Sequence, residues 1–141
     1  LRRDQAMDRD PVREAIVNRI AETLHSDAAL DALVTIAKAS AWESTRRRAA
    51  MKIANNEGAV KRLVGARRLA DIAAVTKASA LRSVAAKFTK ALEEAAVAGG
   101  REGDRETLEF MAAHHPDPAA REAARSELER EAGAKGGHDS A

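Results

Sequence analysis

The sequence predicts an all-α protein built from short, packed helices. Its 141 residues are 45% hydrophobic but only 2% aromatic, and 34 of them are alanine, the strongest helix former. Much of the apolar content is therefore helix-forming rather than the β-branched or aromatic material of strands, which argues against an all-β fold. Apolar residues also recur three or four positions apart, which is the spacing of one helix face.

The composition also excludes several classes of protein. The charged fraction is 33% and no run of about 18 apolar residues occurs, so no membrane span is predicted. No N-terminal stretch has the pattern of a secretory signal, and there is no cysteine for disulfides or thiolate chemistry. We therefore expect a cytoplasmic protein. Because the first residue is Leu1 rather than Met, we also expect a piece of a longer product.

The first helix is predicted to follow an N-terminal lead-in of residues 1–9. Asp10 is placed to cap it, and Pro11 suits the first helical position because the N–H that proline lacks would have no partner there. The inward stripe of this helix is predicted to be Val12, Ile16, Ile20 and Leu24.

Two further helices are predicted before residue 56. Asp27 is expected to cap the second helix, and Ser44 is expected to cap the third, which ends near Asn55. The inward residues of the second helix are Leu30, Leu33, Val34 and Ala37.

Residues 57–98 are predicted to form three helices. One begins near Glu57 and breaks near Gly65, and a second runs through Leu69, Ile72 and Val75. The third is long, from about Ser79 to Ala98. Gly99-Gly100 ends it, because glycine adopts the left-handed conformation that closes a helix.

Two helices and a tail complete the chain. Asp104 opens a helix that Pro116 closes, and Asp117-Pro118 opens the last one, which ends near residue 132. Residues 133–141 contain Gly136-Gly137 and no large apolar side chain, so they are predicted to be a disordered tail.

Two stretches of the sequence match each other. Residues 30–41 align with residues 69–80 at an offset of 39, and both end in Lys-Ala-Ser-Ala. With residues 42–45 treated as an insertion, the helices that follow align at an offset of 35. Arginines recur near the start of each second helix, at positions 13, 46 or 47, 82 and 121. The repeating unit is therefore a helix, a short turn and a second helix.

This pattern resembles the HEAT-repeat family of armadillo-like α-solenoids. The resemblance covers residues 10–132 and rests on Asp10-Pro11-Val12-Arg13 and Asp117-Pro118-Ala119-Ala120-Arg121, with Arg46 and Arg82 as partial matches. It implies one domain of helix pairs stacked in an α-α superhelix, with Arg13, Asp117 and Arg121 in a structural ladder. The middle units lack Asp-Pro, and residues 54–68 form an extra helix, so an irregular helical bundle is the alternative fold.

The net charge of +2 hides a separation of charge along the chain. Residues 44–92 carry twelve basic side chains against two acidic ones, whereas residues 1–43 have a net charge of −2 and residues 93–141 of −6. A basic middle between acidic flanks indicates either an anionic partner or an end that folds back on the middle.

The triplet Arg46-Arg47-Arg48 is the most unusual local feature. Three cations in the predicted first turn of a helix oppose the positive end of its dipole. Either Glu43 and acids of neighbouring repeats offset them, or they hold a phosphate or an acidic peptide. Trp42, the only tryptophan, either packs over the next repeat or serves as an exposed stacking anchor. The predicted partner-binding surface comprises Arg46, Arg47, Arg48, Lys52, Lys61, Arg62, Arg67, Arg68 and Trp42.

Catalysis, a cofactor and a metal are not expected. His114-His115 lacks the spacing of metal ligands, so these histidines are predicted to lie at a solvated helix end. No glycine-rich phosphate loop or nucleophile motif is present. DNA-alkylation glycosylases and some bilin lyases have HEAT-like folds, but one Trp and no Tyr leave no counterpart of an aromatic-lined glycosylase cleft, and nothing marks a pigment site.

The sequence therefore predicts a non-catalytic helical-repeat interaction module, a scaffold that binds an acidic protein partner. The alternative function is nucleic-acid binding through phosphate contacts by the basic central block 46–90, without base readout. The scarcity of aromatic residues argues against single-strand binding by base stacking.

Overall fold

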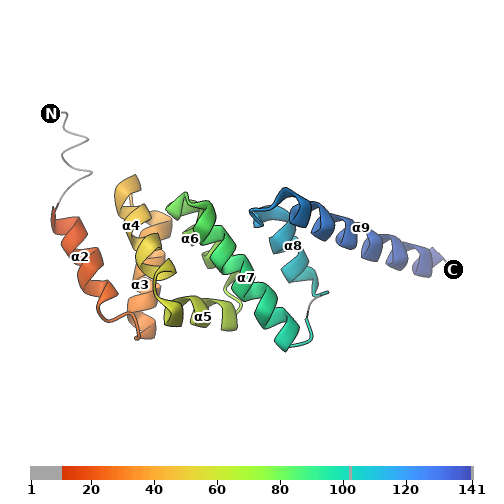
Figure 1. The fold of residues 1–141 in the computed structure, drawn as a ribbon, viewed down its shortest axis with the longest axis horizontal. Coiled ribbons are helices and arrows are strands. Elements are labelled where there is room, and N and C mark those ends of the chain that lie inside the picture. The colour runs from red at the N-terminus through yellow and green to blue at the C-terminus, as the bar shows by residue number, and fades with distance from the viewer. Residues whose placement is uncertain (1–10, 102, 141) are drawn as a thin grey trace. The chain divides into compact units, whose positions relative to one another are not determined.

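Every regular element in the described part of the chain is an α-helix, which confirms the predicted all-α class. The computed structural model describes residues 11–101 and 103–140 of the backbone, and side chains only as far as Gly133 (Figure 1). The predicted lead-in 1–9 and the Asp10 cap lie outside the described residues.

The chain divides into two compact units, one ending at Val84 and the other beginning at Ala85. The sequence predicts one repeat domain over residues 10–132, and the structure places a boundary inside it, in the first turn of a helix. The helices of unit 1 are α2 (Pro11–Ala21), α3 (Asp27–Ala39), α4 (Glu43–Ala54), α5 (Glu57–Gly65) and α6 (Leu69–Ser79). Unit 2 holds most of α7 (Arg82–Ala98), with α8 (Arg105–His114) and α9 (Pro118–Ser140).

In unit 1, α3, α4 and α6 pack against one another, and α2 packs on α3 and α4. The short α5 contacts α4 and α6 and lies across their direction (Figure 1). Two fully buried alanines of α4, Ala49 and Ala50, let the neighbouring helices approach closely. The large side chains of this core are Val17, Leu24, Leu30, Leu33, Ile53, Leu63, Ile72 and Val75.

The starts of α3 and α4 lie one and two residues before the predicted ones. Ser26, not Asp27, caps α3, since its Oγ accepts a hydrogen bond from the N–H of Ala29 at 3.3 Å. Helix α4 begins at Glu43, with Trp42 as its N-cap residue and no side-chain capping bond, so the predicted Ser44 cap is wrong. An acidic residue therefore occupies the first position of α4, where it suits the helix dipole.

The inward face of α2 is only partly the predicted one. Val17 and Leu24 are buried, but Val12 and Ile16 are 64% and 51% exposed. Helix α2 ends at Ala21 and the chain turns before Leu24, so these four predicted positions do not lie on one continuous helix. Apolar residues occur on more than one side of α2, and packing selects the side with Val17.

Helix α7 also starts later than predicted, at Arg82 rather than Ser79. Ser79 is the last residue of α6, and Ala80 follows it in the left-handed region with φ +58°, which breaks the helix. The predicted end holds, because Gly100 follows α7 with φ +69°.

Helix α9 runs to Ser140 and so passes the boundary predicted at residue 132. Asp117 starts it as predicted, since its Oδ1 accepts from the N–H of Ala119 at 3.0 Å. No proline follows Pro118 to stop it, and the glycines beyond residue 132 each cost only about 1 kcal/mol relative to alanine in a helix. The segment predicted as a disordered tail is helical to residue 140 in the structure.

The α3–α4 and α8–α9 connections share one geometry. Ser40 and His115 end their helices with nearly equal backbone angles, φ/ψ −59/138° and −61/134°. Each side chain accepts a hydrogen bond from the N–H two residues later, at 3.3 Å in the Ser40 turn and 3.0 Å in the His115 turn. The fourth residue of the next helix, Arg46 or Arg121, then donates from Nη1 to the Ser40 or His115 carbonyl at 2.7 Å.

This shared arginine bond selects between the two arginines that the predicted repeat left open. Arg46, rather than Arg47, is the structural equivalent of Arg121. Arg121 and Asp117 make bonds within a single turn, whereas the resemblance implies a ladder between repeats. Arg82 is the exposed first residue of α7 and has a different place in its helix.

The division into units predicts that unfolding is not a single transition. Trp42, the only tryptophan, reports on unit 1, whereas far-UV circular dichroism reports on the helices of both units. Unit 2 has fewer large buried side chains, chiefly Phe88, Leu92, Phe110 and Met111, so we expect it to unfold first. In a urea titration the dichroism should fall before the Trp42 fluorescence changes, and coincident curves would contradict the division.

Candidate interaction surface

All nine residues of the predicted partner-binding surface lie in unit 1. Four bases belong to α4, two to α5 and two to the connection between α5 and α6, while Trp42 precedes α4. They are therefore spread over three successive segments rather than gathered in one loop.

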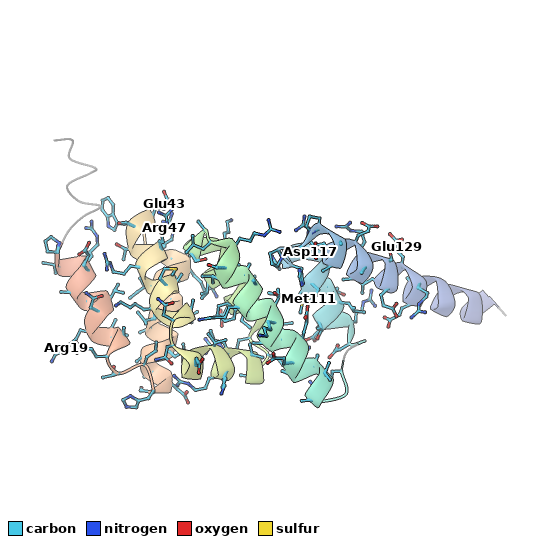
Figure 2. The ribbon with its side chains drawn as sticks, in the orientation of Figure 1. Arg19, Glu43, Arg47, Met111, Asp117 and Glu129 are labelled. Carbon is cyan, nitrogen blue, oxygen red and sulfur yellow. The ribbon has the colours of Figure 1, made fainter. Side chains whose placement is uncertain are left out.

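The arginine triplet is held by bonds inside the unit. The helix starts at Glu43, so Arg46 is its fourth residue and its guanidinium reaches back to the Ser40 carbonyl. Arg47 Nη2 lies 3.0 Å from Glu43 Oε1, one turn earlier on the same helix (Figure 2). Arg48 Nη2 lies 3.1 Å from Oε1 of Glu14 on α2. The structure thus favours the interpretation in which neighbouring acids offset the triplet.

Arg62 joins α5 to the connection between α2 and α3. Its guanidinium donates to the carbonyl of Leu24, to the carbonyl of His25 at 3.1 Å and to Asp27 Oδ1 at 2.9 Å. The Leu24 and His25 carbonyls lie in the turn between α2 and α3, outside both helices, so a multidentate arginine stabilises this turn. Arg62 is therefore a structural residue, because its guanidinium is already bonded within the unit.

Arg68 is at the centre of a network of four charges. Its Nε lies 2.8 Å from Asp71 Oδ2, and its Nη1 lies 2.7 Å from Oδ1 of Asp31 on α3. Lys38, also on α3, reaches Asp71 Oδ1 at 2.8 Å. The network ties α3 to the first turn of α6.

The network shifts the pKa values of two of its members. Partial burial alone would raise the pKa of Asp71, but the hydrogen bonds from Lys38 and Arg68 outweigh it, and the net effect lowers that pKa. Burial likewise acts to lower the pKa of Arg68, but the bonds to Asp71 and Asp31 outweigh it and raise the pKa. The Asp71 carboxylate and the Arg68 guanidinium therefore stabilise each other in their charged forms.

Trp42 and Arg67 also serve the framework of unit 1. The half-buried Trp42 ring lies under the guanidinium of Arg13 on α2, with Cζ 4.4 Å from the ring centroid. Arg67 adopts the left-handed conformation, φ +53°, and its N–H donates to the Val64 carbonyl at 3.0 Å. This conformation lets the chain turn from α5 into α6 without a glycine.

Lys52 and Lys61 differ from the other predicted bases. Lys61 is exposed, Lys52 is half-buried, and neither makes an ion pair with any residue that the structure describes. Over residues 11–84 the sequence has thirteen Lys and Arg against seven Asp and Glu. Five of these carboxylates, those of Glu14, Asp27, Asp31, Glu43 and Asp71, already bind bases inside the unit. The surplus of six positive charges is therefore not neutralised within unit 1.

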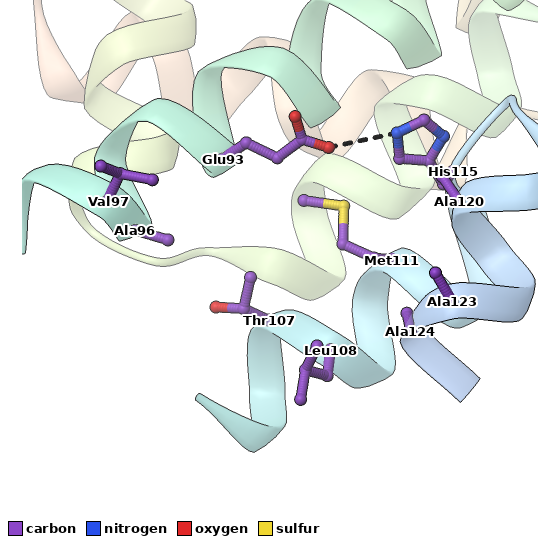
Figure 3. A pocket seen from close by; sticks show the side chains of 10 residues that line it. All are labelled: Glu93, Ala96, Val97, Thr107, Leu108, Met111, His115, Ala120, Ala123 and Ala124. Carbon is purple, nitrogen blue, oxygen red and sulfur yellow. Dashed lines mark hydrogen bonds and ion pairs between the residues drawn. The ribbon is translucent and has the colours of Figure 1, made fainter. Parts of the chain in front are cut away.

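A second surface, an apolar groove of about 300 Å³ in unit 2, is not predicted by the sequence (Figure 3). Its walls come from α7, α8 and α9, and Val97 on its α7 side is 63% exposed. The lining side chains are Glu93, Ala96, Val97, Thr107, Leu108, Met111, His115, Ala120, Ala123 and Ala124. The spacing of Leu108 and Met111 predicts an apolar helix face, but nothing local shows that this face stays partly open.

His115 lies at the polar end of this groove rather than in solvent. Its side chain is 16% exposed, its Nε2 lies 3.2 Å from Glu93 Oε1, and its Nδ1 accepts from the N–H of Asp117 at 3.0 Å. The prediction of a solvated histidine is wrong at this position, though His114 is exposed. Because Nδ1 accepts from a backbone N–H, Nε2 is the ring nitrogen that faces Glu93.

The chain matches no protein-family model, no curated protein and no solved structure. Among the residues that the structure describes, no helix is both long and apolar enough to cross a membrane. Within the same residues, no three metal-ligating side chains lie together.

The charge network predicts a pH-dependent contribution to stability. The lowered pKa of Asp71 means that its stabilising effect is complete above the unfolded value near 3.8 and is lost as the pH falls through the lower folded value. Asp71→Asn should therefore lower the free energy of unfolding by about 1 to 2 kcal/mol at pH 7, and by progressively less as the pH is lowered below 3.8 to pH 3. Urea unfolding followed by Trp42 fluorescence measures the loss at each of the two pH values.

Asp27→Asn is the matched control for this experiment. Asp27 also pairs with an arginine, but its side chain is almost fully exposed, so its removal should change the free energy of unfolding by no more than about 0.5 kcal/mol. An equal loss at pH 7 and pH 3 for Asp71→Asn would show that the charge of Asp71 is not the cause.

The two neighbouring arginines of α4 provide a second test. Arg46→Ala leaves the part-buried Ser40 carbonyl without its donor, so we expect unfolding to become easier by about 1 to 2 kcal/mol. Arg47→Ala removes only an exposed pair and should cost about 0.5 kcal/mol or less. Equal effects of the two substitutions in urea unfolding would contradict the structural role of Arg46.

Proposed function

We propose that the protein is a non-catalytic helical interaction module that holds an acidic protein partner on unit 1. The observation that carries the proposal is the uncompensated charge of that unit. Most of its carboxylates are already bound to arginines, yet six positive charges remain in excess. An acidic surface is the partner that such a charge distribution attracts and orients.

The arrangement of the bases favours a protein over a nucleic acid. Arginine binds phosphate through the paired N–H groups of its planar guanidinium. In Arg46, Arg62 and Arg68 the guanidinium is already bonded to carbonyls or carboxylates of the same unit. The exposed cations that remain available include Lys61 on α5 and Lys77 at the end of α6. Lysines on separate helices suit scattered carboxylates of a folded or extended acidic chain.

The internal bonds also give unit 1 the rigidity that a scaffold needs. Arg48 ties α4 to α2, Arg62 ties α5 to the start of α3, and Arg68 ties the start of α6 to α3. A surface whose helices are fixed in this way loses little conformational entropy when a partner binds. In this proposal the predicted surface has two parts, a framework of arginines and an outer set of lysines.

Fluorescence anisotropy with three labelled probes tests the proposal. The probes are a poly-glutamate peptide, a random-sequence DNA duplex and a DNA single strand, each titrated at several salt concentrations. We expect binding of the peptide and, for the double variant Lys52→Ser and Lys61→Ser, an affinity about three to ten times weaker. Arg125→Ser with Arg130→Ser, on α9 of unit 2, removes the same charge and should leave the peptide affinity nearly unchanged.

Each other outcome has a definite meaning. Tighter binding of the duplex, with an affinity that falls linearly with the logarithm of salt concentration, would replace the proposal with nucleic-acid binding through phosphates. An equal loss in both double variants would show that only net charge matters and that unit 1 is not the site. Absence of all binding at low salt would rule out both functions.

A further inference from the structure

One side of α2 exposes apolar side chains to solvent. Val12, Ala15, Ile16 and Arg19 follow one another at helical spacing and are all exposed. Ile16, more than half exposed, forms the centre of this side, which we call the α2 face. Figure 2 shows Arg19 pointing away from the other helices of unit 1, so the apolar strip ends in a cation.

The groove of unit 2 has the complementary character. Its walls are alanine, leucine, methionine and valine, and its polar end carries Glu93, whose side chain is about half exposed (Figure 3). Glu94 is exposed beside it on α7. An amphipathic helix that carries a cation at one end of its apolar side fits a groove with this arrangement.

The two units also carry opposite net charges. Residues 1–84 have a net charge of +6 and residues 85–141 of −4, although the whole chain has only +2. Two copies of the chain therefore attract each other most strongly when unit 1 of one meets unit 2 of the other.

We propose that the α2 face of one copy docks in the unit 2 groove of a second copy. Ile16 enters the apolar groove beside Val97 and Met111, and Arg19 approaches the carboxylate of Glu93. This contact uses different surfaces on the two copies, so it joins copies head to tail. The inference is independent of the acidic partner, which is assigned to other residues of unit 1.

The association should be weak and dependent on concentration. A helix of eleven residues in a groove buries less area than a standard protein interface. We therefore expect a dissociation constant of roughly micromolar or weaker. Sedimentation velocity from low to high protein concentration should show dimers and longer species forming. Added salt should weaken them without abolishing them, because the contact is partly apolar.

Two substitutions, each with a control on the same helix, test the contact. Ile16→Glu places an acid on the α2 face, and Val97→Glu places one on the exposed wall of the groove. Asn18→Glu and Ala95→Glu make similar changes at exposed positions of α2 and α7 outside the two surfaces. Circular dichroism and Trp42 fluorescence verify that each variant is folded. We expect the first two variants to be monomers and the two controls to associate like the unchanged chain.

Mixing the two defective variants is the decisive experiment. The Ile16→Glu chain keeps its groove and the Val97→Glu chain keeps its α2 face, so an equimolar mixture should form one-to-one dimers and nothing larger. An unchanged chain that stays monomeric at all concentrations would overturn the proposal. So would association of the Val97→Glu chain alone, which would show α2 pairing with α2, or failure of the mixture to form dimers.

Discussion

Arginine side chains that reach from one helix to the carbonyls and carboxylates of another segment are the interaction on which unit 1 depends. Its core contains many alanines, which bury little area, so larger side chains such as Leu33 and Ile53 provide most of the hydrophobic stabilisation. The guanidinium groups of Arg62 and Arg68 add directional bonds between helices. An apolar contact tolerates sliding, whereas a multidentate arginine fixes the position of the segment that it binds.

This use of arginine separates two roles that look alike in the sequence. The bases between residues 46 and 68 form one block when only net charge is considered, but Arg46 closes a turn while Lys61 lies in solvent. Charges bonded within the framework contribute to the surrounding field, but breaking their bonds for a partner costs stability. In the proposed function a partner would contact the lysines first, while the arginines keep the lysine-bearing helices in place.

The two units of the chain present different chemistry to partners. Unit 1 has an excess of positive charge and the exposed α2 face, and unit 2 has an apolar groove with an acidic end. The hydrogen bonds of His115 to Asp117 and Glu93 hold together the turn before α9 and one end of that groove. The turn at Ser40 in unit 1 has the same backbone geometry, but there a serine hydroxyl accepts the hydrogen bond that the His115 ring accepts in unit 2. Two different local sequences therefore form the same turn.

The sequence by itself determined the helices and most of their buried faces. Helix boundaries follow from local bonds, so Asp104, Asp117 and Gly100 act where the sequence predicts, and Leu30, Leu33 and Val34 are buried as expected. Only the tertiary structure decided which side of α2 faces the core, which arginines are bonded, where the two units divide, and that a groove stays open beside Glu93. Several of these features depend on partners more than twenty residues away, such as Asp31 for Arg68 and His115 for Glu93, and a local pattern does not show which distant residues meet.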